Sequence, residues 1–193
     1  SPTLSVPGVT LKNGAYDNAY SVGGYFYIDA IPVVDLEVDF NIQGNKYDIN
    51  FENALGVKMA PLNFAWGSTD VYFTVRKKII GIGIPFLAKA KLFAGGGYNT
   101  HLSTPIANEK MLTSLCDDDL ANCDVTSLDK TLETYMTNKD NYLSSSGFHL
   151  QGGLQFKILM LDSFLFYRHV IAEDVIPGSK GFGSLNLRLG MGF

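Results

Sequence analysis

The chain has 193 residues, a length typical of one domain, and a formal net charge of −4, which excludes the basic surface expected of a nucleic-acid-binding protein. Its longest nearly apolar run covers residues 79–88 and is broken by Gly81, Gly83 and Pro85, so no segment supplies the ~20 consecutive apolar residues of a transmembrane helix. A membrane location would therefore require a closed β-barrel, the only other fold that satisfies every backbone group in lipid.

The first two expected strands cover residues 3–12 and 19–29. In the first, the alternation is weak and Pro7-Gly8 interrupts it, which indicates an edge strand or a bulge. Residues 13–18 are rich in asparagine, glycine and aspartate and have the composition of a turn. In the second strand, apolar residues alternate with polar residues and glycines, as in a strand with two different faces.

Residues 33–43 show the clearest alternation in the chain. Asp35, Glu37 and Asp39 share one parity, and valine, leucine, phenylalanine and isoleucine occupy the other. Carboxylates stacked on one face need solvent or cations beside them. Cations of the matching polar parity follow on the next two expected strands, 70–80 and 87–99: Arg76, Lys78, Lys89 and Lys91.

Three more strands are expected, at residues 147–158, 162–172 and 181–193. The first of them alternates apolar with polar residues. The parity of the second is ambiguous; if Arg168 points inward, Phe164 and Phe166 fill the interior beside it. The last has a strict two-residue period, in which the apolar positions are Leu185, Leu187, Leu189, Met191 and Phe193.

At this final stretch the sequence resembles bacterial outer-membrane β-barrels, whose last strand commonly ends in Phe after alternating apolar residues. The long connections, 44–69 and 100–146, fall on one end of an up-and-down meander and the short ones on the other, as in such barrels. The aromatic residues of 44–69 are too many for a solvated loop and leave two alternatives there, a strand ladder that extends beyond the membrane or a short lid. The resemblance is to the small OmpA/OmpX-like type. It implies an all-β, eight-stranded antiparallel up-and-down transmembrane β-barrel, one domain over 1–193, in the bacterial outer membrane, with Ser1 as the start left after signal-peptide removal.

With the apolar faces toward lipid, the charged side chains point into one interior, where we expect them to form a paired ion network. Its expected members are Asp29, Asp35, Glu37, Asp39, Arg76, Lys78, Lys89, Lys91, Lys157 and Arg188. The alternative for each pair is an exposed salt bridge on a soluble protein, worth ~0–1 kcal/mol. The joint pattern favours the network, because each of these charges has the parity opposite to the apolar residues of its strand.

Residues 100–146 are expected to form a long, partly helical extracellular loop. Leucines recur at helical spacing in two stretches of it, which predicts one or two short helices. Cys116 and Cys123 would form a disulfide in an oxidising compartment, and two free thiols are the alternative. The acidic run 117–119 lacks the ligand spacing of an EF-hand loop and is interpreted as a solvated face, so neither a metal nor a cofactor is expected.

The interior of an eight-stranded barrel is just wide enough for side chains. We therefore expect a structural, surface-exposed outer-membrane protein with a side-chain-filled, non-conducting barrel and no catalytic residues. Its partners would be outer-membrane lipid or lipopolysaccharide, and a protein partner or second copy would bind the 100–146 loop or the barrel wall.

Two alternatives remain open. Some eight-stranded outer-membrane barrels act on lipid A, and deacylases of that type carry a His-x-Ser pair near the outer rim. Here His101 and Ser103 have that spacing, and Glu109 is the nearest glutamate to orient the imidazole. The second alternative is a soluble calycin-like barrel that binds an apolar ligand, with its apolar faces inside and its charged faces in water.

Overall fold

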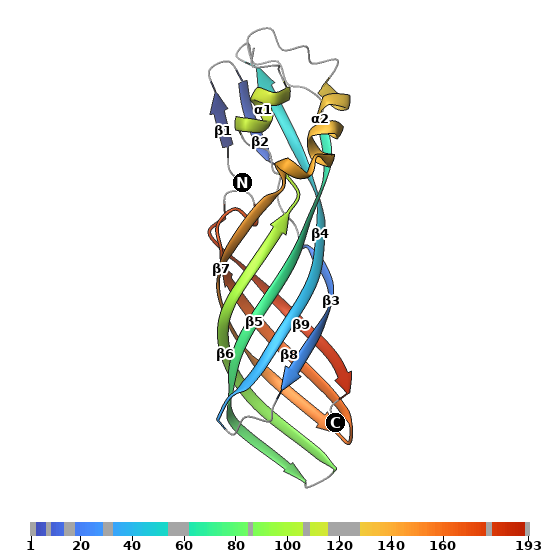
Figure 1. Ribbon diagram of the computed structural model, residues 1–193, viewed down its shortest axis with the longest axis vertical. Helices are drawn as coiled ribbons and strands as arrows, with labels where there is room; N and C mark the ends of the chain where they lie inside the picture. Colours follow the sequence, from blue (N-terminus) through green and yellow to red (C-terminus); the bar gives the residue numbers. More distant parts are fainter. Residues whose placement is uncertain are drawn as a thin grey trace. The chain divides into compact units, whose positions relative to one another are not determined.

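The computed structural model describes residues 3–6, 9–13, 18–28, 33–53, 62–84, 87–105, 109–115, 128–176 and 179–191 (Figure 1). Its strands are β1 (Thr3–Val6), β2 (Val9–Asn13), β3 (Tyr20–Ile28), β4 (Asp35–Asn53), β5 (Leu62–Ile84), β6 (Ala88–Ser103), β7 (Leu143–Ile158), β8 (Leu161–Ile171) and β9 (Phe182–Met191). They form one sheet in the order β1-β2-β4-β5-β6-β7-β8-β9, and β3 also pairs with β4. The expected all-β antiparallel class is confirmed.

Two details of the expected barrel differ from the structure. The strand expected at 3–12 is a hairpin of two strands on either side of Pro7-Gly8, paired from Thr3↔Lys12 to Val6↔Val9, so the described sheet has nine strands rather than eight. Within the described residues, no ladder joins β3 to β9, so the sheet is not closed.

The chain divides into two compact units, and β3, β4, β5, β6 and β7 contribute residues to both. Residues 23–41, 70–100 and 145–193 make up the first, here called the ionic unit. Residues 1–22, 42–69 and 101–144 make up the second, here called the helical unit.

The helical unit contains β1, β2 and the helices α1 (Glu109–Leu115), α2 (Leu128–Thr137) and η1 (Lys139–Asn141, a 3₁₀ turn). Met111 and Leu115 lie one turn apart on α1, as do Leu132 and Tyr135 on α2, and all four side chains are buried. This spacing places each pair on one helix face. Short helices in the 100–146 segment are thus confirmed, and burial raises the pKa of Tyr135.

β4 and β5 run further than expected, so most of the segment 44–69 is strand rather than loop. One face of β4 is exposed in both units. Its exposed residues are the apolar Leu36, Val38 and Phe40 in the ionic unit and the charged Lys46 and Asp48 in the helical unit. The apolar parity reverses near residue 43, although the strand continues. A strand predicted from one constant apolar parity therefore ends before the strand in the structure does.

Some expected features lie outside the described residues: Asp29, the acidic run 117–119, the terminal Phe193, and both Cys116 and Cys123 with their disulfide. No helix in the described part of the chain is long and apolar enough to cross a membrane.

Candidate functional site

The sheet of the ionic unit curls back on itself, as ion pairs between distant strands show. β4 and β8 are four places apart in the sheet order, a separation of about 19 Å if the sheet were flat. Yet Arg168 Nη2 on β8 lies 3.6 Å from Glu37 Oε1 on β4. One face of the sheet therefore encloses an interior, and the other faces outward.

Polar and aromatic side chains occupy this interior. Glu37 is 2% exposed and Asp39 1%, whereas Phe40 and Leu187, on the outward parity, are 49% and 71% exposed. The expected orientation, with apolar residues outward and ionised residues inward, is therefore confirmed for these strands. The calycin-like alternative expects the reverse orientation.

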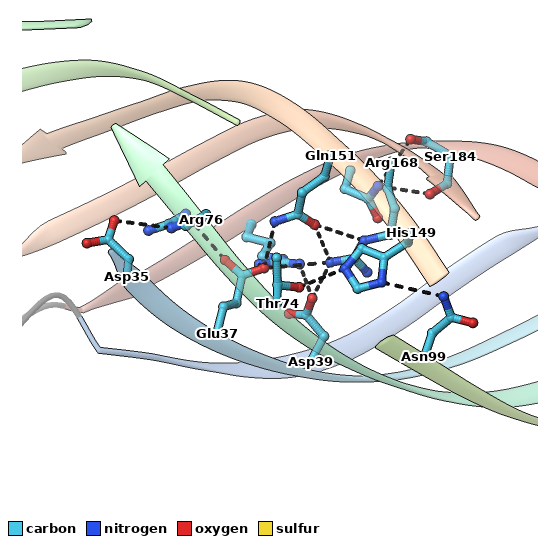
Figure 2. A network of polar contacts seen from close by, with 12 residues as sticks. Asp35, Glu37, Asp39, Thr74, Arg76, Asn99, His149, Gln151, Arg168 and Ser184 are labelled. Atoms are coloured by element: carbon cyan, nitrogen blue, oxygen red, sulfur yellow. Dashed lines mark hydrogen bonds and ion pairs between the residues drawn. The ribbon is translucent and has the colours of Figure 1, made fainter. Parts of the chain in front are cut away.

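Arg168 is one of the fully buried cations of the interior. Its Nε and Nη2 donate to Gln151 Oε1 at 2.9 and 2.7 Å, and its Nη2 also donates to Asp39 Oδ2 (Figure 2). Gln151 in turn donates from Nε2 to Glu37 Oε1 at 3.0 Å. The guanidinium carbon lies 4.0 Å from the ring centre of Tyr72, so the charge is held by carboxylates, an amide and a π-face together.

Arg188, on β9, reaches the same two carboxylates. Its Nη1 lies 2.9 Å from Glu37 Oε1, and its Nη2 pairs with Asp39 Oδ2. Its guanidinium carbon lies 4.3 Å from the ring centre of Phe166. Glu37 and Asp39 therefore join β4 to both β8 and β9 across the interior.

Arg76, on β5, completes the network and is surrounded by aromatic rings. It pairs with Asp35 at 3.4 Å and with Glu37 Oε2 at 3.3 Å. The guanidinium carbon lies 3.9 Å from the ring centre of Tyr27 and 4.7 Å from those of Phe93 and Phe164. These rings exclude water from the ion pairs, which reduces their screening.

The network thus has equal numbers of carboxylates and guanidinium groups. Its acids are Asp35, Glu37 and Asp39, and its bases are Arg76, Arg168 and Arg188. A separate pair joins Lys157 Nζ to Asp162 at 3.5 Å, and Gln155 Nε2 donates to the same carboxylate at 2.8 Å. Buried charges are tolerated when they are paired. Arg76 is held by its ion pairs and ring contacts, since its guanidinium nitrogens make no hydrogen bond in the described part of the chain.

The structure brings together part of the expected network and leaves part of it outside. Asp35, Glu37, Asp39, Arg76 and Arg188 meet as described. Among the described residues, no carboxylate lies within ion-pairing distance of Lys78, Lys89 or Lys91. Lys78 lies on β5 two residues beyond Arg76, and Lys89 and Lys91 lie on β6. All three are nearer the β5–β6 connection, where the interior is more exposed.

Sequence reasoning did not include several buried polar residues in the network. Arg168 was only a conditional candidate, and Gln151, Thr74 and Asn99 were not selected because uncharged side chains give a weak signal. Thr74 Oγ1 lies 2.9 Å from His149 Nε2 (Figure 2), and Asn99 Nδ2 lies 3.5 Å from His149 Nδ1. Their parity could have identified them, because each shares the inward parity of its strand.

The His-x-Ser pair lies in the helical unit. His101 and Ser103 are both buried, but residues i and i+2 of a strand are spaced by about 6.6 Å along it. The hydroxyl of Ser103 donates to Ser68 Oγ at 3.2 Å, so its proton is directed at a serine and not at a base. The side chain of Glu109 lies outside the described residues. This geometry gives no support to an activated serine.

Gly153 allows β7 to approach β8 closely at Leu165 and Phe166. A Cβ at this position would lie 2.3 Å from both Leu165 O and Phe166 Cβ. We expect Gly153→Val to lower the free energy of unfolding by about 1–3 kcal/mol, because the backbone of β8 at Leu165 and Phe166 must move. Gly152→Val is the matched control, since a Cβ there meets nothing closer than Phe93 O at 3.6 Å. Urea unfolding of both variants checks this, and equal effects would contradict it.

No group of three or more His, Cys, Asp or Glu side chains is placed to hold a metal ion in the described part of the chain. Comparison with protein-family models, with curated proteins and with solved structures finds no match to this chain.

Proposed function

We propose that this protein is an integral outer-membrane protein with a structural, surface-exposed role, whose ionic unit lies in the bilayer. The observation that carries the proposal is the reversed burial of its side chains. Leu36, Phe40, Leu187 and Leu189 are 38–71% exposed, while Glu37 and Asp39 are buried and the side chain of Arg188 is 12% exposed. Monomeric soluble proteins rarely expose contiguous apolar surface on this scale, and hydrocarbon is the environment in which such a surface is favourable.

On β4 and β5 the outward-facing residues are large and apolar only along part of the strand, which supports a membrane-spanning band limited to the ionic unit. On β5 the outward residues Phe73 and Val75 belong to the ionic unit, and Ala65, Gly67 and Thr69 to the helical unit. β8 has 11 residues, and a spanning β-strand needs about 9–11. Each large apolar side chain that leaves water contributes about 1.5–3 kcal/mol. Lipid around the ionic unit and water around the helical unit fit this division.

A barrel closed between β3 and β9 is part of the proposal, because an open sheet edge is not tolerated in lipid. Its support is the close approach of Tyr25 on β3 to Gly190 on β9, where a Cβ would lie 2.1 Å from the Tyr25 hydroxyl. The Tyr25 ring also packs edge-on against Phe164, with centres 5.7 Å apart. A side chain at residue 190 would displace Tyr25, so glycine is the residue that fits where β3 and β9 would meet.

The barrel of this proposal does not conduct solutes, because side chains fill its interior. Phe93, Phe164 and Phe166 form a buried cluster against which Tyr25 and Tyr27 pack, and the arginine network adjoins it. The partner-binding role falls to the segment 100–146, which carries α1 and α2. A protein partner or a second copy bound there, and lipid or lipopolysaccharide around the wall, complete the proposed set of partners.

Detergent extraction combined with heat-modifiable gel mobility tests the proposed location. We expect the folded chain to remain with membranes until detergent is added, and to migrate differently before and after boiling in dodecyl sulfate. The physical reason is that the closed ladder and the ion network resist the detergent until they are heated. A chain that stays in solution without detergent, with one mobility under both conditions, would contradict the proposal.

A further inference from the structure

A cationic cavity lies at one end of the ionic unit, apart from the arginine network. Its volume is about 730 Å³, and it lies between the end of β5, the start of β6 and the β7–β8 turn. Four lysines line it: Lys78, Lys89, Lys91 and Lys157. The volume is in the range of about 300–1,000 Å³ typical of ligand pockets.

The charges of this cavity are unbalanced. Lys157 is paired with Asp162 at 3.5 Å, but no described carboxylate lies within ion-pairing distance of Lys78, Lys89 or Lys91. The arginine network cannot supply a partner, because its three carboxylates are already matched by its three guanidinium groups. Lysines converging on a recess with apolar walls create a positive potential that concentrates anions.

The backbone around the cavity makes room for the lysine side chains. A Cβ at Gly81 would lie 3.4 Å from Lys91 Cγ, and one at Gly83 would lie 3.0 Å from Lys89 Cγ. The two glycines thus leave open the space beside the lysine stems. In the β7–β8 turn, Leu159 has a positive φ of 55°, which is uncommon for leucine.

A backbone hydrogen bond fixes that strained turn against the β5–β6 side of the cavity. Leu159 N donates to Leu87 O at 3.1 Å. Leu87, Leu159 and Ile82 are also apolar members of the lining. The cavity therefore combines ammonium groups with apolar side chains on a backbone that is held in place.

We infer that this cavity binds a phosphate-bearing anion. Several ammonium groups without carboxylate partners fit a multiply charged group better than a single carboxylate, and lysine binds phosphate as a point charge. The phosphate could belong to a lipid headgroup, whose chains would meet Ile82, Leu87 and Leu159, or to a soluble phosphate compound. The inference goes beyond the proposed function and does not depend on it, since either source can be tested on the purified chain.

Calorimetric titration of the full chain in an uncharged detergent tests the site with three probes. These are inorganic pyrophosphate, dihexanoyl phosphatidylglycerol and, as the zwitterionic comparison, dihexanoyl phosphatidylcholine. We expect saturable 1:1 binding of at least one of the two anionic probes, with affinity falling as salt is raised. Lys89→Gln combined with Lys91→Gln should weaken that binding at least tenfold. The matched control replaces Lys139 and Lys180, two exposed lysines that do not line the cavity.

Each outcome has a defined meaning. Binding of phosphatidylglycerol alone identifies a lipid headgroup as the source, and binding of pyrophosphate alone identifies a soluble phosphate compound. Binding of both supports a phosphate site that accepts either. The inference is overturned if neither anion saturates, if phosphatidylcholine binds as tightly, or if the control variant weakens binding as much as the cavity variant. A chain that binds pyrophosphate but needs no detergent would overturn the proposed membrane location and leave this inference standing.

Discussion

Replacing Arg168 by methionine should lower the free energy of unfolding by about 3–5 kcal/mol, the cost typical of removing one partner of a buried ion pair. Arg168 is 1% exposed, and its guanidinium contacts Asp39, Glu37 and Gln151. Methionine fills much of the same volume but leaves the network with one more carboxylate than it has guanidinium groups. Denaturant unfolding of the folded chain in lipid or detergent measures the loss.

A double-mutant cycle separates the effect of charge from that of packing. Arg168→Gln leaves the network one charge too negative, and Asp39→Asn leaves it one charge too positive, but the two together restore neutrality. We therefore expect the double variant to lose less stability than the sum of the single losses, with a coupling of about 0.5–3 kcal/mol. Lys180→Met, at an exposed residue, is the control and should be close to neutral. Additive losses would contradict a network held by charge balance.

Placing an arginine on the outward face at Leu187 should also cost about 2–4 kcal/mol if that face lies in hydrocarbon. Leu187 on β9 pairs with Leu165, which lies in the middle of β8. The side chain of Leu187 is 71% exposed. The same substitution in water, on an exposed strand position, should change stability by only about 0.5 kcal/mol. The size of the effect therefore reports the surroundings of the side chain.

Ala65→Arg is the matched control for Leu187→Arg. Ala65 is an exposed residue of β5 that belongs to the helical unit, where the proposal places water. We expect a nearly neutral effect there and a large one at Leu187. Equal, small effects at both positions would contradict a bilayer around the ionic unit.

Side-chain parity carried most of what the sequence could predict. In residues 33–43 the alternation places Asp35, Glu37 and Asp39 on one face, and all three lie on the inward face of the sheet. Parity is a local property, fixed by the two-residue period of a strand, so it needs no knowledge of distant contacts. Parity predicts the same inward direction for Lys78 and Arg76, and therefore cannot show that only Arg76 forms ion pairs with the carboxylates.

What parity could not predict depends on contacts between distant strands. Arg168 meets Asp39 across 129 positions of sequence, and only the curvature of the sheet brings them together. The full length of β4 stayed one of two alternatives for a related reason. Its apolar parity changes near residue 43, close to the point between residues 41 and 42 where the chain passes from the ionic unit to the helical unit. When only the apolar–polar alternation is available, a strand that passes from one environment to another has the same pattern as a strand that ends.

The most direct measurement is the fluorescence of a tryptophan placed at Leu165 and exposed to brominated lipid. Leu154, Leu165 and Leu187 form an outward row across β7, β8 and β9, and the chain has a single tryptophan, so the parent chain supplies the background to subtract. If the outward face lies in hydrocarbon, brominated acyl chains quench the added tryptophan strongly and aqueous acrylamide quenches it weakly. Strong quenching by acrylamide with none by brominated lipid would show that the face lies in water and would contradict the account.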